Sequence, residues 1–269
     1  IAFVFQMFAL YPHMNVRKNI SYPLKSQGMP RAAIKQKVGE IAEILGITEI
    51  LDRPVGGLSG GDRQRVALGR AIVRDPKAFF MDEPLGALDA EFREHMSEEL
   101  RALHDRMNAT TVYVTHDQLE AMQMGDKIVV MNHGVVEQFG VPQSIYDWPA
   151  TKFVAEFIGS PPMNFLDFQG TAGKGATNVS FGNATFEIPR LLEGQSGDLT
   201  FGVRPEHIRL DDNAHFRGEI SAVEYLGTTQ IITLNTTAGI VKVRSSSSNK
   251  VLIGDKTGLS FDPRTVTIF

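Results

Sequence analysis

Two carboxylates and a histidine follow short apolar runs of the sequence. Asp82 and Glu83 come directly after Ala78–Met81, and His116 follows the β-branched and aromatic run Thr111–Thr115. Such runs predict buried strands of a parallel sheet, and sites in these sheets gather at the carboxyl ends of the strands. A carboxylate there can bind a hard cation such as Mg²⁺ or act as a general base. The structural alternative stays open, since an acid pair after a strand also caps the following turn.

A glycine-rich turn at Leu58–Arg65 is expected to open a helix. Ser59 suits the N-cap position, and apolar residues follow it at helical spacing. The free backbone N–H groups and the dipole at a helix start favour a phosphate group. Gly60 and Gly61 carry no Cβ, so the backbone there can approach a ligand closely. The turn is therefore a candidate phosphate site.

The segments Leu58–Arg65 and Ala78–Pro84 together resemble the signature and Walker B motifs of ABC-transporter ATPases in order, spacing and flanking residues. The resemblance covers essentially the whole chain and is closest to the sugar and glycerol-phosphate importers. Met163–Leu166 and Gly202–Ile208 resemble that branch specifically. The resemblance implies an ATP-binding, ATP-hydrolysing subunit of an importer, and it favours a carbohydrate or a glycerol phosphate as the solute.

The resemblance also implies roles for single residues. Asp82 would bind Mg²⁺ through water, Glu83 would be the general base for the attacking water, and His116 would hydrogen-bond the γ-phosphate. Gln6 lies in a segment similar to the family's Q-loop and would touch both Mg²⁺ and the attacking water; the structural alternative is a polar strand end. Asp89, in a segment similar to the D-loop, would connect two nucleotide sites at a dimer interface, and it also suits the N-cap of the next helix.

In this family two ATPase subunits pack head to tail, so Ser59, Gly60 and Gly61 would contact ATP held by the other subunit. The implied partners are a second copy or a paralogous ATPase subunit, two membrane permease subunits and, indirectly, an extracytoplasmic solute-binding protein. The expected location is the cytoplasmic face of the inner or plasma membrane, as a peripheral subunit. Asp62 departs from the glutamine most often found in the motif. We expect its side chain to point away from the phosphate, because two negative charges repel.

Composition limits the other function classes. The 269 residues carry a net charge of −4, which gives no reason to expect nucleic acid as a partner. They include no cysteine, so a thiol nucleophile and a zinc site with cysteine ligands are excluded. No apolar run approaches the ~20 residues that span a bilayer, so a transport role would need membrane-spanning parts in another chain. No G-x-x-x-x-G-K-S/T segment occurs. We therefore expect an N-terminally truncated ATPase that is inactive without this phosphate loop.

The expected fold class is α/β, with a parallel sheet of the P-loop NTPase type, incomplete at its N-terminus, and a helical subdomain that carries the signature. Pro30–Gly46 shows apolar residues at helical spacing and belongs to that subdomain. After the breaker cluster Gly159–Pro162, evenly spaced short runs predict an all-β barrel or sandwich. This part is similar to the family's OB-like (TOBE-type) regulatory domain. The predicted domains are residues 1–159 and 160–269.

Two other functions stay open. A non-catalytic regulatory or structural fragment would bind partners through its C-terminal domain; the lack of a phosphate loop favours it, and the presence of Gln6, Asp82, Glu83 and His116 opposes it. An ABC ATPase of DNA repair or translation is the third candidate, and the β-rich C-terminal region argues against it.

Overall fold

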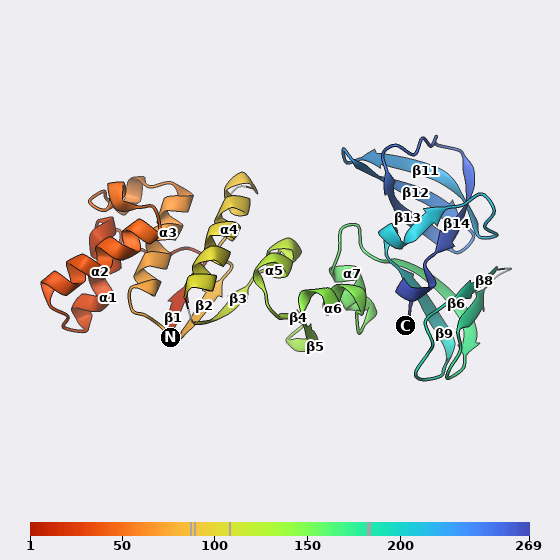
Figure 1. The fold of residues 1–269 in the computed structure, drawn as a ribbon, viewed down its shortest axis with the longest axis horizontal. Helices are drawn as coiled ribbons and strands as arrows, with labels where there is room; N and C mark the ends of the chain where they lie inside the picture. Colours follow the sequence, from red (N-terminus) through yellow and green to blue (C-terminus); the bar gives the residue numbers. More distant parts are fainter. Residues whose placement is uncertain (87, 89, 108, 182–183) are drawn as a thin grey trace. The chain divides into compact units, whose positions relative to one another are not determined.

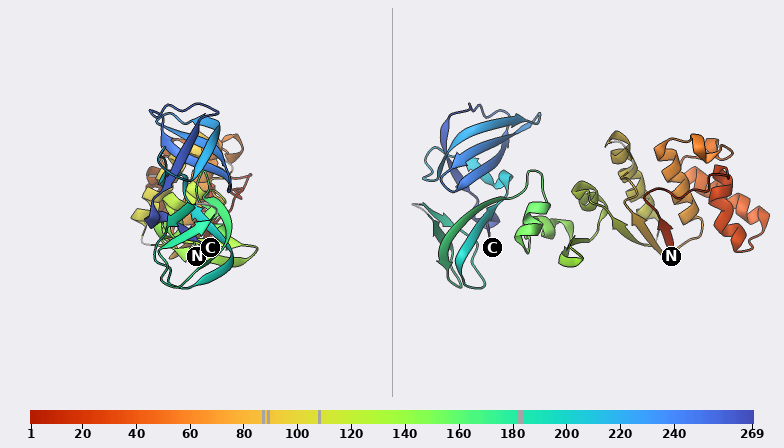
Figure 2. Two further views of the ribbon diagram at one scale, coloured as in Figure 1. Left: turned by 90° about the vertical axis from the view of Figure 1, so that its right-hand side faces the viewer. Right: turned by 180° about the vertical axis from the view of Figure 1, so that it is seen from behind.

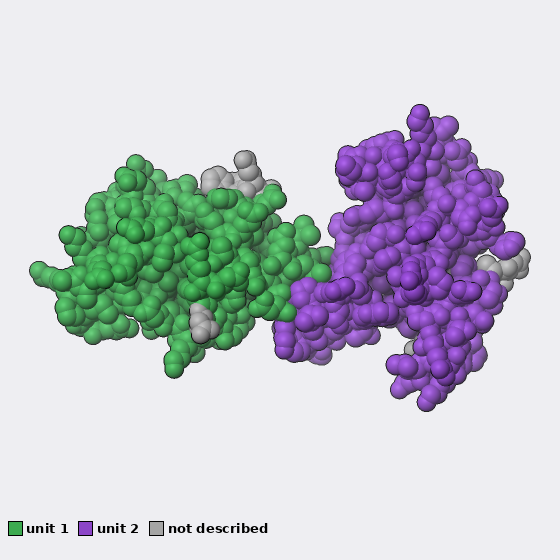
Figure 3. Space-filling model, viewed as in Figure 1, with its two compact units in different colours: residues 1–126 green, residues 127–269 purple. Residues whose placement is uncertain are grey.

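The computed structural model describes residues 1–86, 88, 90–107, 109–181 and 184–269. By their contacts these residues form two compact units, 1–126 and 127–269, which Figure 3 colours separately. Residues 127–159, which we expected in the first domain, belong by their contacts to unit 2. The division of the sequence into domains at 159 and 160 stays a prediction.

Unit 1 combines helices with a parallel sheet, as predicted (Figure 1). In chain order its described helices and strands are β1 (Ala2–Val4), α1 (Val16–Ser26), α2 (Arg31–Ile44), α3 (Gly60–Ile72), β2 (Ala78–Asp82), α4 (Ala90–Arg106), β3 (Thr110–Val114) and α5 (Gln118–Met124), with short 3-10 helices at Thr48–Ile50 and Val55–Gly57. The sheet order is β1-β2-β3, and both pairings are parallel. The carboxyl ends of these strands therefore meet at one edge of the sheet.

Side chains alternate between the two faces of this sheet. Phe79 and Met81 of β2 lie in the apolar core with residues of α1, α2 and α3, whereas Phe80 is 36% exposed. On β3, Val112 and Val114 are exposed as well. The prediction that Ala78–Met81 is buried throughout was wrong, because neighbouring strand residues point to opposite faces and the described helical core contacts one of them.

The helical part of unit 1 carries the signature as predicted, with one helix more than expected. Pro30 stands at the N-cap of α2 and Gly46 follows its end with φ +62°, so the predicted start and stop signals are used. Helix α1 was not predicted. It contains Pro23 and buries the polar side chain of Asn19, and these two residues interrupt its apolar spacing. Its N-terminus is capped by Asn15.

Unit 2 is mostly antiparallel β-structure. In chain order its described helices and strands are β4 (Ile128–Asn132), β5 (Val135–Gly140), α6 (Pro142–Asp147), α7 (Lys152–Phe157), β6 (Asn164–Ala172), β7 (Asn178–Phe181), β8 (Ala184–Glu187), β9 (Gln195–Val203), β10 (Ile208–Leu210), β11 (Arg217–Tyr225), β12 (Thr229–Thr236), β13 (Gly239–Ser246), β14 (Lys256–Phe261) and β15 (Thr267–Ile268), with 3-10 helices at Pro205–His207 and Pro263–Thr265. One sheet has the order β10-β14-β11-β12-β13 and another β15-β9-β6. Figure 2 shows these sheets from behind, the first mainly blue and the second mainly green.

Strands β4 and β5 pair as an antiparallel hairpin, and the two short helices α6 and α7 follow it. The all-β character of the C-terminal region is confirmed. Strands β6 and β10 were not predicted as strands. In β6 the polar residues Asn164, Asp167 and Gln169 and the glycine Gly170 interrupt the apolar pattern, although the side chains of Leu166 and Phe168 are buried in alternation.

Within the described parts of the chain, every helix is too short or too polar to cross a bilayer.

Candidate functional site

The two carboxylates lie at the carboxyl end of β2. Asp82 is the last residue of the strand and pairs in register with Val114, and the Glu83 N–H donates to the Val114 carbonyl at 2.9 Å. Glu83 has φ +42°, a left-handed conformation that is uncommon for a residue with a Cβ. Such backbone costs of order 1–3 kcal/mol and is concentrated at functional sites. The strained turn directs the two neighbouring carboxylates differently.

The Glu83 carboxylate lies between Gln6 and His116. Gln6 Nε2 donates to Glu83 Oε2 at 2.7 Å, and His116 Nδ1 lies 3.0 Å from Glu83 Oε1. The three residues follow β1, β2 and β3 respectively, so the parallel sheet brings together side chains that are far apart in the sequence. The Glu83 side chain is 29% exposed, and that of His116 is 72% exposed. The carboxylate is therefore oriented from both sides yet accessible to water.

Asp82 differs from its neighbour because its carboxylate is exposed and has no hydrogen bond or ion pair with the described residues. The side-chain oxygen of Gln6 is also left without a recorded partner, since its amide nitrogen makes the bond to Glu83. No group of three or more Asp, Glu, His or Cys side chains in the described part of the chain is arranged to hold a metal ion by itself. Mg²⁺ needs no such cluster, because it uses one or two carboxylates, waters and phosphate oxygens. The donors at this edge fit that ion.

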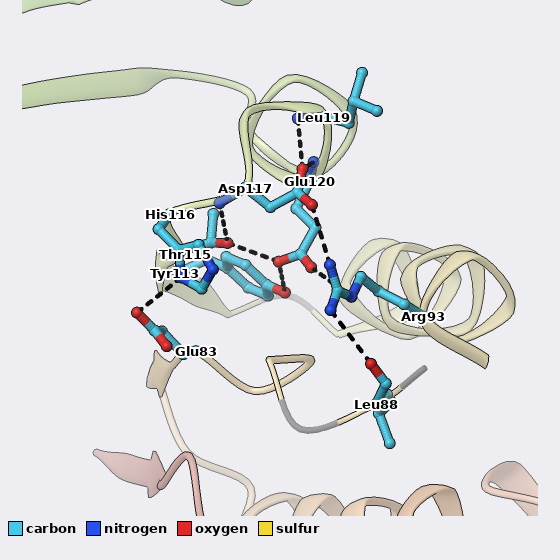
Figure 4. Close-up of polar contacts among 9 residues, drawn as sticks. All are labelled: Glu83, Leu88, Arg93, Tyr113, Thr115, His116, Asp117, Leu119 and Glu120. Atoms are coloured by element: carbon cyan, nitrogen blue, oxygen red, sulfur yellow. Dashed lines mark hydrogen bonds and ion pairs between the residues drawn. The ribbon is translucent and has the colours of Figure 1, made fainter. Parts of the chain in front are cut away.

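The segment that carries His116 is fixed by a buried carboxylate, Glu120 (Figure 4). Glu120 is 5% exposed and accepts hydrogen bonds from the hydroxyls of Tyr113 at 3.0 Å and Thr115 at 2.8 Å. Asp117 caps α5 by accepting from the Leu119 N–H at 2.8 Å. Burial, followed by the Glu120 charge, raises the pKa of Tyr113, so its hydroxyl stays protonated and continues to donate. Glu120 therefore holds both flanks of the turn at His116.

Arg93 of α4 connects this turn to the residues that follow β2. Its guanidinium lies 3.3 Å from Asp117 and 3.7 Å from Glu120, and it donates to the Leu88 carbonyl at 3.2 Å (Figure 4). Arg93 and Glu120 were not singled out in the sequence analysis. The one signal in the sequence was the acidic residue four positions after His116. Its role could be recognised only once Arg93 on the neighbouring helix α4 was known to lie beside it.

The signature turn begins α3 as predicted. Ser59 is the N-cap, and its Oγ accepts from the Asp62 N–H at 3.1 Å. The same hydroxyl donates to Asp62 Oδ2 at 2.8 Å, and Asp62 Oδ1 lies 3.8 Å from Arg65. The Asp62 side chain thus folds back onto the cap at the start of the helix, where an acid is favoured by the dipole. That the Asp62 side chain points away from a bound phosphate stays a prediction.

Gly60 of the turn permits a close approach within the protein itself. A Cβ on Gly60 would lie 3.2 Å from Leu88 Cδ2, so the signature turn packs against the segment that follows β2. Asp89, predicted at a dimer interface, lies outside the described residues. The structure therefore brings together Gln6, Glu83 and His116. The signature turn has no hydrogen bond to these three side chains among the described residues. The roles assigned to all these residues stay predictions.

Comparison with known proteins identifies three family models along the chain. One described as ABC transporter matches residues 1–86, a MalK OB fold domain matches 159–208, and a TOBE domain matches 201–269. The trehalose/maltose import ATP-binding protein MalK of Thermococcus litoralis is 46% identical over 282 residues, which cover 100% of this chain and 76% of the relative. The sn-glycerol-3-phosphate import ATP-binding protein UgpC of a Ruegeria species is 51% identical, with 86% of this chain and 64% of the relative covered.

A solved structure shares the fold. CbiO1 from Clostridium perfringens, described as part of the ABC transporter complex CbiONQ, matches with a TM-score of 0.51 and 26% identity over 55% of this chain and 60% of that chain. The chain spans about two thirds of the length of the Ruegeria relative. Both relatives are named as import ATP-binding proteins, one for trehalose and maltose and one for sn-glycerol 3-phosphate. The chain therefore belongs to the ABC-transporter ATP-binding proteins, in the branch that contains these sugar and glycerol-phosphate import subunits.

Proposed function

We propose that the product of the complete reading frame containing this sequence hydrolyses ATP and couples the hydrolysis to import of a carbohydrate or a glycerol phosphate. The observation that carries this proposal is the Glu83 carboxylate, held by Gln6 and His116 at the edge of a parallel sheet. A carboxylate oriented in this way, beside a second carboxylate without a partner, has the chemistry of a general base next to a cation ligand.

The residues at this edge share the tasks of the proposed reaction. Asp82 and the amide oxygen of Gln6 would hold Mg²⁺, and the ion would supply positive charge to the phosphate oxygens of ATP. Glu83 accepts a proton from the attacking water, and Gln6 keeps the carboxylate in position. His116 contacts the other oxygen of Glu83 through Nδ1, and with a proton on both ring nitrogens its Nε2–H would donate to the γ-phosphate. Two observations support these roles: the chemical types of the side chains at this edge and the hydrogen bonds that orient Glu83.

The signature turn acts on a second copy of the site. We assign Ser59, Gly60 and Gly61 to the γ-phosphate of ATP held by a partner ATPase subunit, either a second copy of this protein or a paralogue. The helix start supplies backbone N–H groups, and the Ser59 hydroxyl is a donor once it is released from Asp62. Asp89 is assigned to the same interface. Closure of the dimer on ATP and its reopening after hydrolysis form the two states of the transport cycle.

A groove beside the Gln6 segment is the proposed docking place for a permease subunit. It has a volume of about 620 Å³, and aromatic side chains line it, including Phe3, Phe5, Tyr11 and Tyr22. The neighbouring Gln6 segment belongs to the nucleotide site, so a permease helix seated here would sense the state of that site. Two permease subunits, served by a solute-binding protein on the other side, would place this subunit peripherally on the cytoplasmic face of a membrane.

Replacement of Glu83 tests the proposal in the product of the complete reading frame. Glu83→Gln keeps the shape and removes the base, so turnover of ATP should fall by roughly 10²–10⁴-fold, while binding of ATP, measured with a fluorescent analogue, should persist. Glu98→Gln is the matched control, because Glu98 is exposed on α4 and has no recorded side-chain partner. Turnover that survives in Glu83→Gln would remove Glu83 from the role of base. A parent protein without ATPase activity would instead favour the regulatory alternative.

A further inference from the structure

The backbone directly after Gln6 is strained. Phe8 has φ +61° and Ala9 has φ +45°, two consecutive left-handed residues of which neither is glycine. The only backbone bonds recorded within this bend are local ones, from the Phe8 N–H to the Phe5 carbonyl at 2.9 Å and from the Ala9 N–H to the Met7 carbonyl at 2.6 Å. Such backbone persists only where the surrounding structure holds it. The bend decides where the chain places Gln6.

Arg70 of α3 holds this bend. Its Nη1 donates to the Ala9 carbonyl at 2.7 Å, and its Nη2 donates to the Phe8 carbonyl at 3.0 Å. The guanidinium thus contacts the carbonyls of both left-handed residues. It also lies over the Tyr11 ring, 5.3 Å from the ring centre. A planar fork of N–H donors suits two adjacent carbonyls, whereas a lysine could offer only a point charge.

The recorded partners of Arg70 all belong to this loop. Among the described residues no carboxylate forms an ion pair with it, although most arginines of unit 1 with recorded side-chain contacts meet an aspartate or a glutamate. Burial lowers the pKa of the Arg70 guanidinium, and the Tyr11 hydroxyl opposes that shift. Even a partly desolvated charge without a carboxylate is costly, so the position of Arg70 indicates that holding the loop is its task.

The far end of the loop is anchored independently. The buried Asn19 of α1 accepts from the Tyr11 N–H at 2.8 Å and donates to the Tyr11 carbonyl at 3.2 Å. At the near end Gln6 is bound to Glu83. Arg70 therefore supports the middle of a span whose two ends are already attached, at the point where the strain lies.

The helix that carries Arg70 is the one that begins at the signature turn. Ser59 caps α3, and Arg70 lies eleven residues later on the same helix, roughly 16 Å along its axis. We propose that Arg70 is a positioning residue that ties the loop after Gln6 to the signature helix and thereby keeps Gln6 on Glu83. A displacement of α3 at its N-terminus would then move the Gln6 loop with it. The inference rests on the proposed ATPase function, since it assigns Gln6 to the hydrolytic site.

The test compares Arg70→Gln, Arg70→Lys and the control Arg31→Gln in the product of the complete reading frame. Arg31 is exposed at the start of α2 and has no recorded side-chain partner. Turnover of ATP by Arg70→Gln should fall about ten- to a hundredfold, the factor that loss of a hydrogen bond to a charged group produces. The KM for ATP should stay within about twofold, and Arg70→Lys should lie between parent and Arg70→Gln.

Two readouts separate positioning from a general structural role. Guanidinium ion at non-denaturing concentration should raise the turnover of Arg70→Ala and leave that of Arg31→Ala unchanged, because the ion can occupy the vacated place. Ala9→Gly should make turnover less dependent on Arg70, since glycine adopts positive φ without strain. If Arg70→Gln does not fold, the turnover of Arg70→Lys is compared with that of the double variant Arg70→Lys/Ala9→Gly instead.

The outcomes distinguish the inference from the function on which it rests. Arg70 variants with the turnover of the Arg31 control would overturn the inference while leaving the ATPase proposal intact. A loss that neither guanidinium ion nor Ala9→Gly relieves would overturn it as well, because the residue would then be structural. A parent protein with no ATPase activity would overturn the proposed function, and the assigned role of Arg70 with it.

Discussion

Replacing Arg204 with methionine is expected to destabilise unit 2 strongly. Arg204 is 2% exposed and follows β9, yet its guanidinium reaches the segment of α6 and α7. It donates to the Tyr146 carbonyl at 2.8 Å and to the Ile158 carbonyl at 2.5 Å, and it lies 3.9 Å from the centre of the Tyr146 ring. Burial removes the guanidinium largely from water and lowers its pKa.

The magnitude follows from these contacts. Each hydrogen bond from a charged donor contributes about 1.5–3 kcal/mol, so the two short bonds of Arg204 are worth about 3–6 kcal/mol together. Methionine does not bear the cost of burying a charge, and this offsets part of the loss. We expect the free energy of unfolding to fall by about 3 kcal/mol. With a urea dependence of about 1–3 kcal/mol per molar, the unfolding midpoint should move down by about 1–3 M.

Trp148 makes the measurement simple. It is the single tryptophan of the sequence and directly follows α6, close in the chain to Tyr146. Its fluorescence during urea unfolding reports on the segment that Arg204 holds. Arg209→Met is the matched control, because Arg209 is exposed on β10 and has no recorded side-chain partner. A change below about 0.5 kcal/mol for Arg204→Met, or one equal to that of the control, would refute the reasoning.

Three further predictions concern separate features. Asp62→Gln should lower the KM for ATP about two- to fivefold in initial-rate assays, because it frees the Ser59 hydroxyl and removes a negative charge from a helix start; an unchanged or higher KM would contradict this. Burial raises the pKa of Tyr146 to about 12, so the stability that the protonated hydroxyl contributes is complete below pH ~10 and is lost towards pH ~12. The free energy of unfolding, measured with urea at several pH values across this window, should fall with pH, and it should fall less steeply in Tyr146→Phe. Gly159→Ala should reduce the free energy of unfolding by more than about 1 kcal/mol, because the residue has φ +118° and a Cβ would lie 2.7 Å from Arg204 Nη1; a midpoint equal to that of the parent in the same titration would rule out the clash.

The meeting of three side chains at the sheet edge could be predicted because each follows an apolar run that forms a strand. Local sequence shows where a strand ends, and parallel pairing then brings the ends together at one edge. Gln6, Glu83 and His116 meet for this reason, with Glu83 bound from both sides. The signature turn was also local, since Ser59 at an N-cap is a property of consecutive residues. The family resemblance joined these local features into one site.

The supporting residues could not be predicted in the same way. Glu120 is buried because Tyr113, Thr115 and Arg93 surround it, and these come from different elements. The sequence around a charged helix residue does not reveal whether its side chain is buried in a hydrogen-bond network or exposed to solvent. The missed helix α1 has a related cause, since Asn19 is buried where it donates to the carbonyls of Tyr11 and Met14, which lie in the turn before the helix. In each case the reason for the residue lies outside its own segment.

Arg70 and Arg204 show which kind of information was missing. Both donate to backbone carbonyls in a bend or at a helix end. Because every residue has a backbone carbonyl, the sequence does not show which carbonyls need such a donor. A bend or a helix end leaves carbonyls without partners in its own ladder, and buried ones must be satisfied from elsewhere. Arginine, with five donors in a fixed fork, is suited to that task. The strained pair Phe8 and Ala9 therefore requires a donor, and the structure supplies it from the helix that begins at the signature turn.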